Sequence, residues 1–193
     1  MRILARPRHI ASLLIVLSVV VVCAAGCAAE GRQGAPGIHT VVSPIDEGEV
    51  PEGTTVFDDD VPAVAHLDPA LREALRAATE RAADDGEMLR VNSGWRSPAL
   101  QERLLRDAVG TYGSLEEAAR WVATPETSAH VSGDAVDVGP WDGADWLDRH
   151  GEAFGLCRIY VNEPWHFELR PDAPTAGCPR MYLDPTEDPR MAG

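Results

Sequence analysis

Apolar residues recur at helical spacing after Asp68, which predicts an amphipathic helix from Pro69 to about Asp85. Asp68 is a typical capping residue, and proline suits the first helical position. The predicted buried face consists of Leu71, Leu75, Ala78 and Ala82. A second helix is expected from Pro98 to Val109 and a third from Leu115 to Ala123.

Shorter apolar stretches predict the strands of a small sheet. The candidate strands are Met88–Val91, Ala135–Val138, Ile159–Val161 and Trp165–Leu169. In the second stretch two valines alternate with Asp137, so this carboxylate should point away from the apolar face. Residues 126–133 are expected to form a loop and Trp146–His150 part of a short helix. Because helices come first and strands later, we expect an α+β single domain with a small antiparallel sheet flanked by helices.

The amino-terminal segment has the pattern of an export signal. Arg2, Arg6 and Arg8 precede an apolar run of about ten residues, whereas a membrane-spanning helix needs roughly twenty. We expect residues 1–26 to be a signal peptide and residues 27–60, rich in Gly and Pro among acidic residues, to be a flexible tether. Residues 61–183 should form the folded domain, and residues 184–193 a disordered tail.

Residues 24–27, Ala-Ala-Gly-Cys, resemble a bacterial lipobox, in which Cys27 would be acylated after cleavage. Lipoboxes usually carry Leu where Ala24 stands here, so plain secretion is the alternative. The protein is therefore expected outside the cytosol, either anchored to the extracytoplasmic face of the membrane through Cys27 or secreted.

Charge and cysteine content narrow the class of protein. The net charge is -14, and removal of the signal, which carries three Arg and no acid, would make it -17, so a nucleic-acid partner is excluded. Cys157 and Cys178 remain in the folded part and are predicted to form a disulfide in an exported protein, worth about 3 kcal/mol. A thiolate metal site is the alternative, although neither cysteine has a ligand neighbour at metal spacing.

Two histidine-containing segments could build one metal site. His130 and Asp137 are joined through Gly133, which could fold the chain back so that imidazole and carboxylate converge. His166 follows Glu163 by three positions, and Pro164 would have to kink the chain for both to address the same ion. Two His and one carboxylate suit zinc and leave a fourth position open for water. The alternative is a pair of hydrogen-bonded core histidines.

These motifs resemble those of a known family. Ser128-x-His130-x-x-Gly133-x-x-x-Asp137, then Glu163-x-Trp165-His166, with Ser-Gly-Trp-Arg-Ser at residues 93–97 and Gln101 upstream, are similar to the VanY-type D-alanyl-D-alanine carboxypeptidases. The resemblance implies a fold of the hedgehog and D-Ala-D-Ala peptidase type and a single Zn²⁺ ion held by His130, Asp137 and His166. It also implies that Glu163 is the general base and Arg96 a transition-state donor, with Gln101 and Ser128 around the substrate. A surface ion pair is the alternative for Arg96.

The function implied by this resemblance is removal of the terminal D-Ala from peptidoglycan stem peptides, by a monomer at the membrane surface or in the cell wall. Three other functions remain open because the shape of the cleft decides specificity. They are a D,D-dipeptidase, a peptidoglycan endopeptidase and a non-catalytic, zinc-stabilised module that binds the cell wall.

Overall fold

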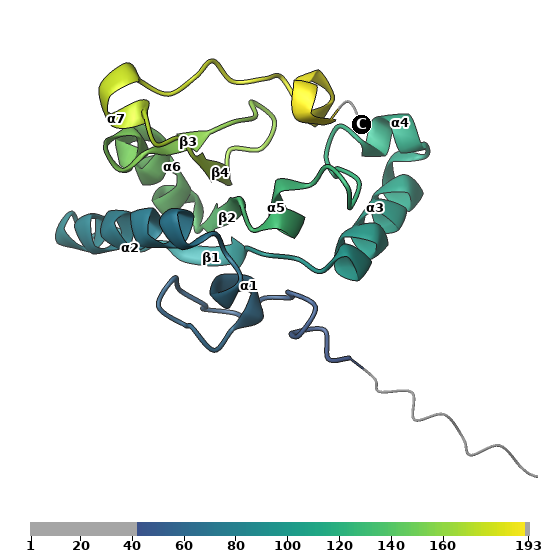
Figure 1. The fold of residues 1–193 in the computed structure, drawn as a ribbon, viewed down its shortest axis with the longest axis horizontal. Coiled ribbons are helices and arrows are strands. Elements are labelled where there is room, and N and C mark those ends of the chain that lie inside the picture. The colour runs from purple at the N-terminus through teal and green to yellow at the C-terminus, as the bar shows by residue number, and fades with distance from the viewer. Residues whose placement is uncertain (1–41, 192–193) are drawn as a thin grey trace, which may run out of the picture. The chain divides into compact units, whose positions relative to one another are not determined.

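The computed structural model describes residues 42–191, and the predicted signal peptide and Cys27 lie outside this range. Figure 1 shows helices around one small sheet. In chain order the elements are α1 (Pro62–Ala65), α2 (Pro69–Asp84), β1 (Arg90–Ser93), α3 (Pro98–Tyr112), α4 (Leu115–Ala118), α5 (Ala129–Ser132), β2 (Ala135–Gly139), α6 (Trp141–His150), η1 (Gly151–Phe154), β3 (Leu156–Arg158), β4 (His166–Leu169), α7 (Ala173–Ala176), η2 (Pro185–Glu187) and η3 (Pro189–Met191). None of the helices in this range is long and apolar enough to cross a bilayer.

The two long helices begin where the sequence predicts. The Asp68 carboxylate accepts hydrogen bonds from the backbone N–H groups of Ala70 and Leu71, which satisfies donors at the start of α2. Ser97 caps α3 in the same way through the N–H of Leu100. Helix α2 buries the four apolar positions that its periodicity marks.

The sheet is antiparallel throughout, with strand order β1-β2-β4-β3, and confirms the predicted α+β class. One face of the sheet packs on α2 and α6 and forms the main core, to which Val136, Val138 and Phe167 contribute. Because side chains alternate along a strand, Asp137 and His166 point to the opposite face. Asp137 and His166 therefore lie on strands whose other face is packed in the core.

Some predicted elements differ from the structure. The third helix ends at Ala118 rather than at Ala123, and hydrogen-bonded turns continue to Val122. Residues 129–132 form the single helical turn α5 within the predicted loop, and the helix predicted at 146–150 already begins at Trp141. Residues 159–161 are not a strand of the sheet, since Tyr160 instead makes an isolated bridge with Tyr182.

The predicted tether is wrong for residues 42–60, the part of it that the structure describes. The Val91 N–H donates to the Thr54 carbonyl oxygen, the Ser97 N–H donates to that of Glu47, and Val56 is buried in the core. Glycine and proline form tight turns here, and one of them, Gly48 (φ 103°), lies so close to the Trp95 backbone that a side chain would collide with it. The folded part therefore begins well before residue 61.

The predicted disordered tail is also wrong for residues 184–191. Asp184 and Asp188 are buried, and the Tyr160 hydroxyl donates a hydrogen bond of 2.9 Å to Asp188. These polar contacts carry no hydrophobic periodicity, so the sequence pattern did not reveal them. The predicted disulfide between Cys157 and Cys178 is confirmed, with Cα atoms 5.6 Å apart.

Candidate metal and active site

The sheet register brings two of the predicted ligands together. Asp137 on β2 lies directly opposite His166 on β4, and side chains of such a pair project from the same face at close range. His130 arrives from α5, and Gly133 (φ 83°) then turns the chain into β2. A side chain at Gly133 would meet the His66 carbonyl oxygen at 2.4 Å, so this turn requires glycine.

The three candidate ligand atoms lie close enough together to hold one metal ion, and both distances from Asp137 match a tetrahedral site. Asp137 Oδ1 lies 3.4 Å from His130 Nε2 and 3.3 Å from His166 Nδ1, and all three atoms lie within 4.8 Å of one another. Zinc bonds of 2.0–2.1 Å at tetrahedral angles place ligand atoms about 3.3 Å apart. Asp137 Oδ1 and His166 Nδ1 are buried without a hydrogen-bond partner. Because buried polar atoms rarely remain unpaired, these orphaned atoms fit a bound cation.

Hydrogen bonds fix the tautomer that each histidine needs as a ligand. His130 Nδ1 lies 2.8 Å from the Gly94 carbonyl oxygen, which can only accept, so the proton sits on Nδ1 and Nε2 is free. His166 uses the opposite nitrogen, since its Nε2 lies 3.2 Å from Glu168 Oε1 and its Nδ1 faces Asp137. Such outer contacts orient metal-binding imidazoles and raise their basicity.

Glu163 is held beside the metal site by the turn that precedes β4. The His166 N–H donates to the Glu163 carbonyl oxygen at 3.1 Å, so Pro164 and Trp165 form a tight turn, as the predicted kink requires. Glu163 Oε2 lies 3.6 Å from His166 Nδ1, and Oε1 is buried without a partner. Burial raises the pKa of Glu163 to about 7, despite the opposing effect of the His166 charge.

Arg96 reaches the site from the loop after β1. Its Nη2 donates to Asp137 Oδ2 at 2.9 Å, its Nη1 to Gln101 Oε1 at 3.1 Å and its Nε to Ser93 Oγ at 2.8 Å. The pair with Asp137 is largely buried, so the alternative of a surface ion pair for Arg96 does not hold. Gln101 uses its amide nitrogen on the Ala123 carbonyl oxygen, and therefore both ends of its side chain are engaged within the protein.

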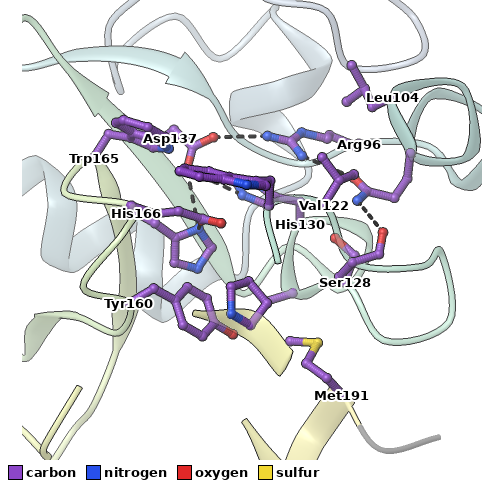
Figure 2. Close-up of a pocket in the computed structure, with 16 residues that line it drawn as sticks. Arg96, Leu104, Val122, Ser128, His130, Asp137, Tyr160, Trp165, His166 and Met191 are labelled. Carbon is purple, nitrogen blue, oxygen red and sulfur yellow. Dashed lines mark hydrogen bonds and ion pairs between the residues drawn. The ribbon is translucent and has the colours of Figure 1, made fainter. Parts of the chain in front are cut away.

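The predicted residues line one pocket of about 220 Å³. Figure 2 shows Arg96, Asp137, His130 and His166 converging on it, with Tyr160 beside His166 and Met191 at the lower edge of the view. Ser128 also lines the pocket, and its side chain does not cap α5. The remaining wall is mainly apolar, and consists of Leu104, Trp121, Val122, Ala123, Ala129, Trp165 and Pro185.

Charge in the site favours a cation. Burial alone would raise the pKa of Asp137, but the neighbouring His130, His166 and Arg96 hold it well below its usual range. Burial opposes protonation of His166, but the adjacent carboxylates Asp137 and Glu168 raise its pKa to about 9. Burial lowers the pKa of His130, which favours the neutral imidazole that binds metals.

The sequence interpretation missed Glu168, which is buried behind His166. Its carboxylate accepts from His166 and pairs with Arg170 and Arg190. A signal was present, because Glu168 follows His166 by two positions in a strand and must share its face. The roles of Tyr160 and Arg190 had no comparable signal in the local pattern.

Comparison with known proteins identifies the family of this chain. The family model VanY, D-alanyl-D-alanine carboxypeptidase, matches residues 64–172. A D-alanyl-D-alanine carboxypeptidase of Enterococcus faecalis is 32% identical over 127 residues, which cover 52% of this chain and 46% of that protein. This chain thus spans about half the length of that relative.

Two solved structures have a similar fold. A mutant of the vancomycin resistance D,D-pentapeptidase VanY from the VanB-type cassette, in complex with Zn(II), is 28% identical with a TM-score of 0.51, covering 53% of this chain and 72% of that chain. VanYB in complex with D-alanine-D-alanine is 28% identical with a TM-score of 0.50, and the match covers 53% of this chain and 71% of that chain. The family match extends over more than half of the sequence and includes all three candidate ligands and Glu163. The chain therefore belongs to the VanY family of D-alanyl-D-alanine carboxypeptidases.

Proposed function

We propose that this protein is a zinc-dependent D,D-carboxypeptidase that hydrolyses the terminal D-Ala from peptidoglycan stem peptides. The observation that carries the proposal is the buried carboxylate of Glu163, which has an unpaired oxygen beside three convergent ligand atoms. A carboxylate with a pKa of about 7 is matched to proton transfer near neutral pH. A module that only binds the cell wall would not need such a group.

His130, Asp137 and His166 are the residues that would hold the zinc ion. Bound there, zinc would supply Lewis-acid activation of water and polarise the scissile carbonyl. Glu163 would accept a proton from the attacking water and deliver it to the nitrogen of the departing D-Ala. Its Oε2 lies 3.6 Å from His166 Nδ1, which places the carboxylate at the edge of the metal site.

Arg96 would stabilise the negative charge that develops on the carbonyl oxygen. Ser93, Gln101 and Asp137 fix its guanidinium in place, so little reorganisation is needed when that charge forms. We propose that Gln101 acts by positioning Arg96, because its Oε1 accepts from Arg96 and its Nε2 is held by the Ala123 carbonyl oxygen. Ser128, on the pocket wall, is our candidate for a hydrogen bond to the substrate.

The substrate class rests on the family and on the site. D-alanine-D-alanine is bound by VanYB, whose fold this chain resembles, and the pocket has a largely apolar wall around a few polar groups. Because peptidoglycan lies outside the cytosol, we propose that the protein acts there. The disulfide supports an oxidising compartment. We also propose that Cys27 carries a lipid anchor and that the protein is a monomer.

Defined tripeptide, tetrapeptide and pentapeptide stems, together with free D-Ala-D-Ala, test the proposal. The wild-type protein should release D-Ala from the pentapeptide, lose this activity with a chelator and regain it with zinc. Glu163→Gln should retain zinc and the folded circular-dichroism spectrum but lose about a hundredfold or more in rate. Glu80→Gln, an exposed position on α2, is the matched control and should behave as wild type.

Each alternative has a distinct outcome. Cleavage of free D-Ala-D-Ala in preference to the pentapeptide would indicate a dipeptidase, and a cut within the stem would indicate an endopeptidase. Zinc binding and cosedimentation with peptidoglycan without any product would indicate a binding module. Undiminished activity of Glu163→Gln would contradict the role of the base.

A further inference from the structure

The carboxyl-terminal segment, residues 182–191, packs against the functional site from outside the sheet. The Tyr182 N–H donates to the Ile159 carbonyl oxygen at 3.0 Å, and the Val161 N–H donates to that of Tyr182 at 2.9 Å. In Figure 1 the yellow chain that follows α7 runs toward α4, and this segment is its last part. Pro185 and Met191 line the pocket, so the segment forms part of its wall.

Arg190 binds the carboxylate that holds His166. Its Nη1 lies 2.6 Å from Glu168 Oε2, and its Nη2 lies 3.1 Å from Glu168 Oε1. Glu168 Oε1 is also the atom that accepts from His166 Nε2. A guanidinium that engages both oxygens fixes the plane of the carboxylate, and this plane sets the direction from which the imidazole is held.

Arg170 contacts the same carboxylate differently. Its Nη2 reaches only Oε2, at 2.8 Å, which is the oxygen that does not face His166. Arg170 therefore contributes charge to Glu168 but does not fix the orientation of Oε1. Comparing Arg170 with Arg190 therefore separates the effect of neutralising the Glu168 carboxylate from the effect of orienting it.

Asp188 connects Arg190 to a second contact of the same histidine. Its carboxylate accepts from the Arg190 guanidinium and from the Tyr160 hydroxyl. The Tyr160 ring lies 5.1 Å from the His166 ring, centroid to centroid, and packs beside it. The segment thus supports His166 both through the hydrogen bond of Glu168 and through the packing of Tyr160.

We infer that Arg190 is a positioning residue for the metal site, and that docking of the carboxyl-terminal segment increases the affinity of the site for zinc by fixing His166 through Glu168. Arg190 lies beyond residues 64–172, the part of the chain that matches the family model. The inference rests on the metal site of the proposed function. Partners of this kind typically change metal affinity by about 10- to 100-fold, and because Arg190 acts one contact further out, we expect about tenfold.

Zinc affinity, measured by competition with a chromophoric chelator, tests the inference without any substrate. Arg190→Ala should bind zinc about tenfold more weakly, and Arg190→Lys should lie between this variant and wild type, because an ammonium cannot engage both oxygens in one plane. Arg170→Ala is the matched control and should stay within about twofold of wild type. The visible spectrum of the cobalt-substituted protein should change in Arg190→Ala and not in Arg170→Ala, since it reports the geometry around the ion.

Thermal unfolding of the metal-free proteins separates positioning from a merely structural role. A structural role would lower the unfolding temperature of Arg190→Ala but leave the zinc affinity and cobalt spectrum of the folded protein unchanged, which would overturn the inference. If Arg190→Ala does not fold, Arg190→Lys and Asp188→Asn carry the test, and unchanged zinc affinity in both would overturn it. If the variants bind zinc as tightly as wild type, and wild type releases D-Ala, only this inference is defeated and the proposed function stands. Failure of wild type to bind zinc defeats the proposed function as well.

Discussion

Glu163 and Glu168 are both buried in the site, but their surroundings predict opposite effects on stability. The Glu163 carboxylate has an unpaired oxygen, and burial raises its pKa from 4.5 to about 7. Burial also disfavours the charge of Glu168, but hydrogen bonds from His166 and Arg190 outweigh it and lower its pKa. The ionised form is therefore unfavourable in the folded protein at Glu163 and favourable at Glu168.

The size of the effect at Glu163 follows from proton linkage. A carboxyl group with a raised pKa binds its proton more tightly in the folded state, so the protein loses stability as the pH rises from 4.5 to 7. A shift of the Glu163 pKa from 4.5 to about 7 lowers the free energy of unfolding by about 3 kcal/mol at pH 8, relative to a carboxyl group that stays protonated. At pH 5 the loss is about 1 kcal/mol or less. Ionised Glu163 therefore destabilises the metal-free protein most at neutral and alkaline pH.

Glu163→Gln removes this cost while keeping the shape of the side chain. In metal-free protein at pH 8 the free energy of unfolding should rise by up to about 3 kcal/mol, and the unfolding temperature by about 6–12 °C. At pH 5 the gain should fall to about 1 kcal/mol or less. Urea and thermal unfolding in the presence of a chelator, across this pH range, measure the difference.

Glu168→Gln is the control with the opposite sign. Because its pKa is lowered in the folded protein, Glu168 stabilises the fold at pH values above the pKa that it has in the unfolded chain. Glu168→Gln should therefore be less stable than wild type at pH 8, and the difference should shrink as the pH falls. Zinc should reduce the gain of Glu163→Gln, since a bound cation offsets the charge of the wild-type carboxylate. A gain that is the same at pH 5 and pH 8, or absent at both, would refute the reasoning that burial of an unpaired charge sets the pKa of Glu163.

Three further predictions concern other parts of the molecule. Reduction of the Cys157–Cys178 disulfide, which joins residues 21 apart, should lower the free energy of unfolding by about 3 kcal/mol, and an unchanged urea midpoint with reductant would contradict this. Arg96→Lys should retain zinc but release D-Ala about a hundredfold more slowly, because lysine cannot reproduce the directed donors of a guanidinium; a rate equal to wild type would remove Arg96 from the mechanism. Gly133→Ala should lower the free energy of unfolding by more than about 1 kcal/mol, because its φ of 83° and its approach to the His66 carbonyl oxygen exclude a side chain, and calorimetry would detect the loss.

Local patterns accounted for much of the fold. The helix that Asp68 caps was predictable because its cap, its first-turn proline and its apolar face agree with one another. Alternation placed Asp137 on the face opposite the core, and this prediction is confirmed by the burial of Val136 and Val138 on the other face. The last strands were harder to assign, because short apolar runs do not reveal which segment supplies the partner backbone.

Compositional signals failed at both ends of the described chain. Residues 42–60 were predicted to be a flexible tether because they are rich in glycine, proline and acidic residues. The same residues also build tight turns in a folded segment, and only contacts with distant parts of the chain distinguish a tether from a folded segment. Asp188 and Arg190 read as parts of a polar tail for the same reason. The burial of Asp188 and the ion pair of Arg190 depend on Tyr160 and Glu168, which are more than twenty residues away in the chain.

The sequence by itself determined which side chains could carry the chemistry, because residue types, their order and the turn at Gly133 are local properties. Only the tertiary structure decided how those side chains meet. The pairing of Asp137 with His166, the separate tautomers of the two histidines and the return of Arg190 to Glu168 all depend on strand register and on hydrogen bonds between distant segments. Hydrophobic periodicity carries no information about such contacts, since it describes burial along one element and not the identity of its neighbours.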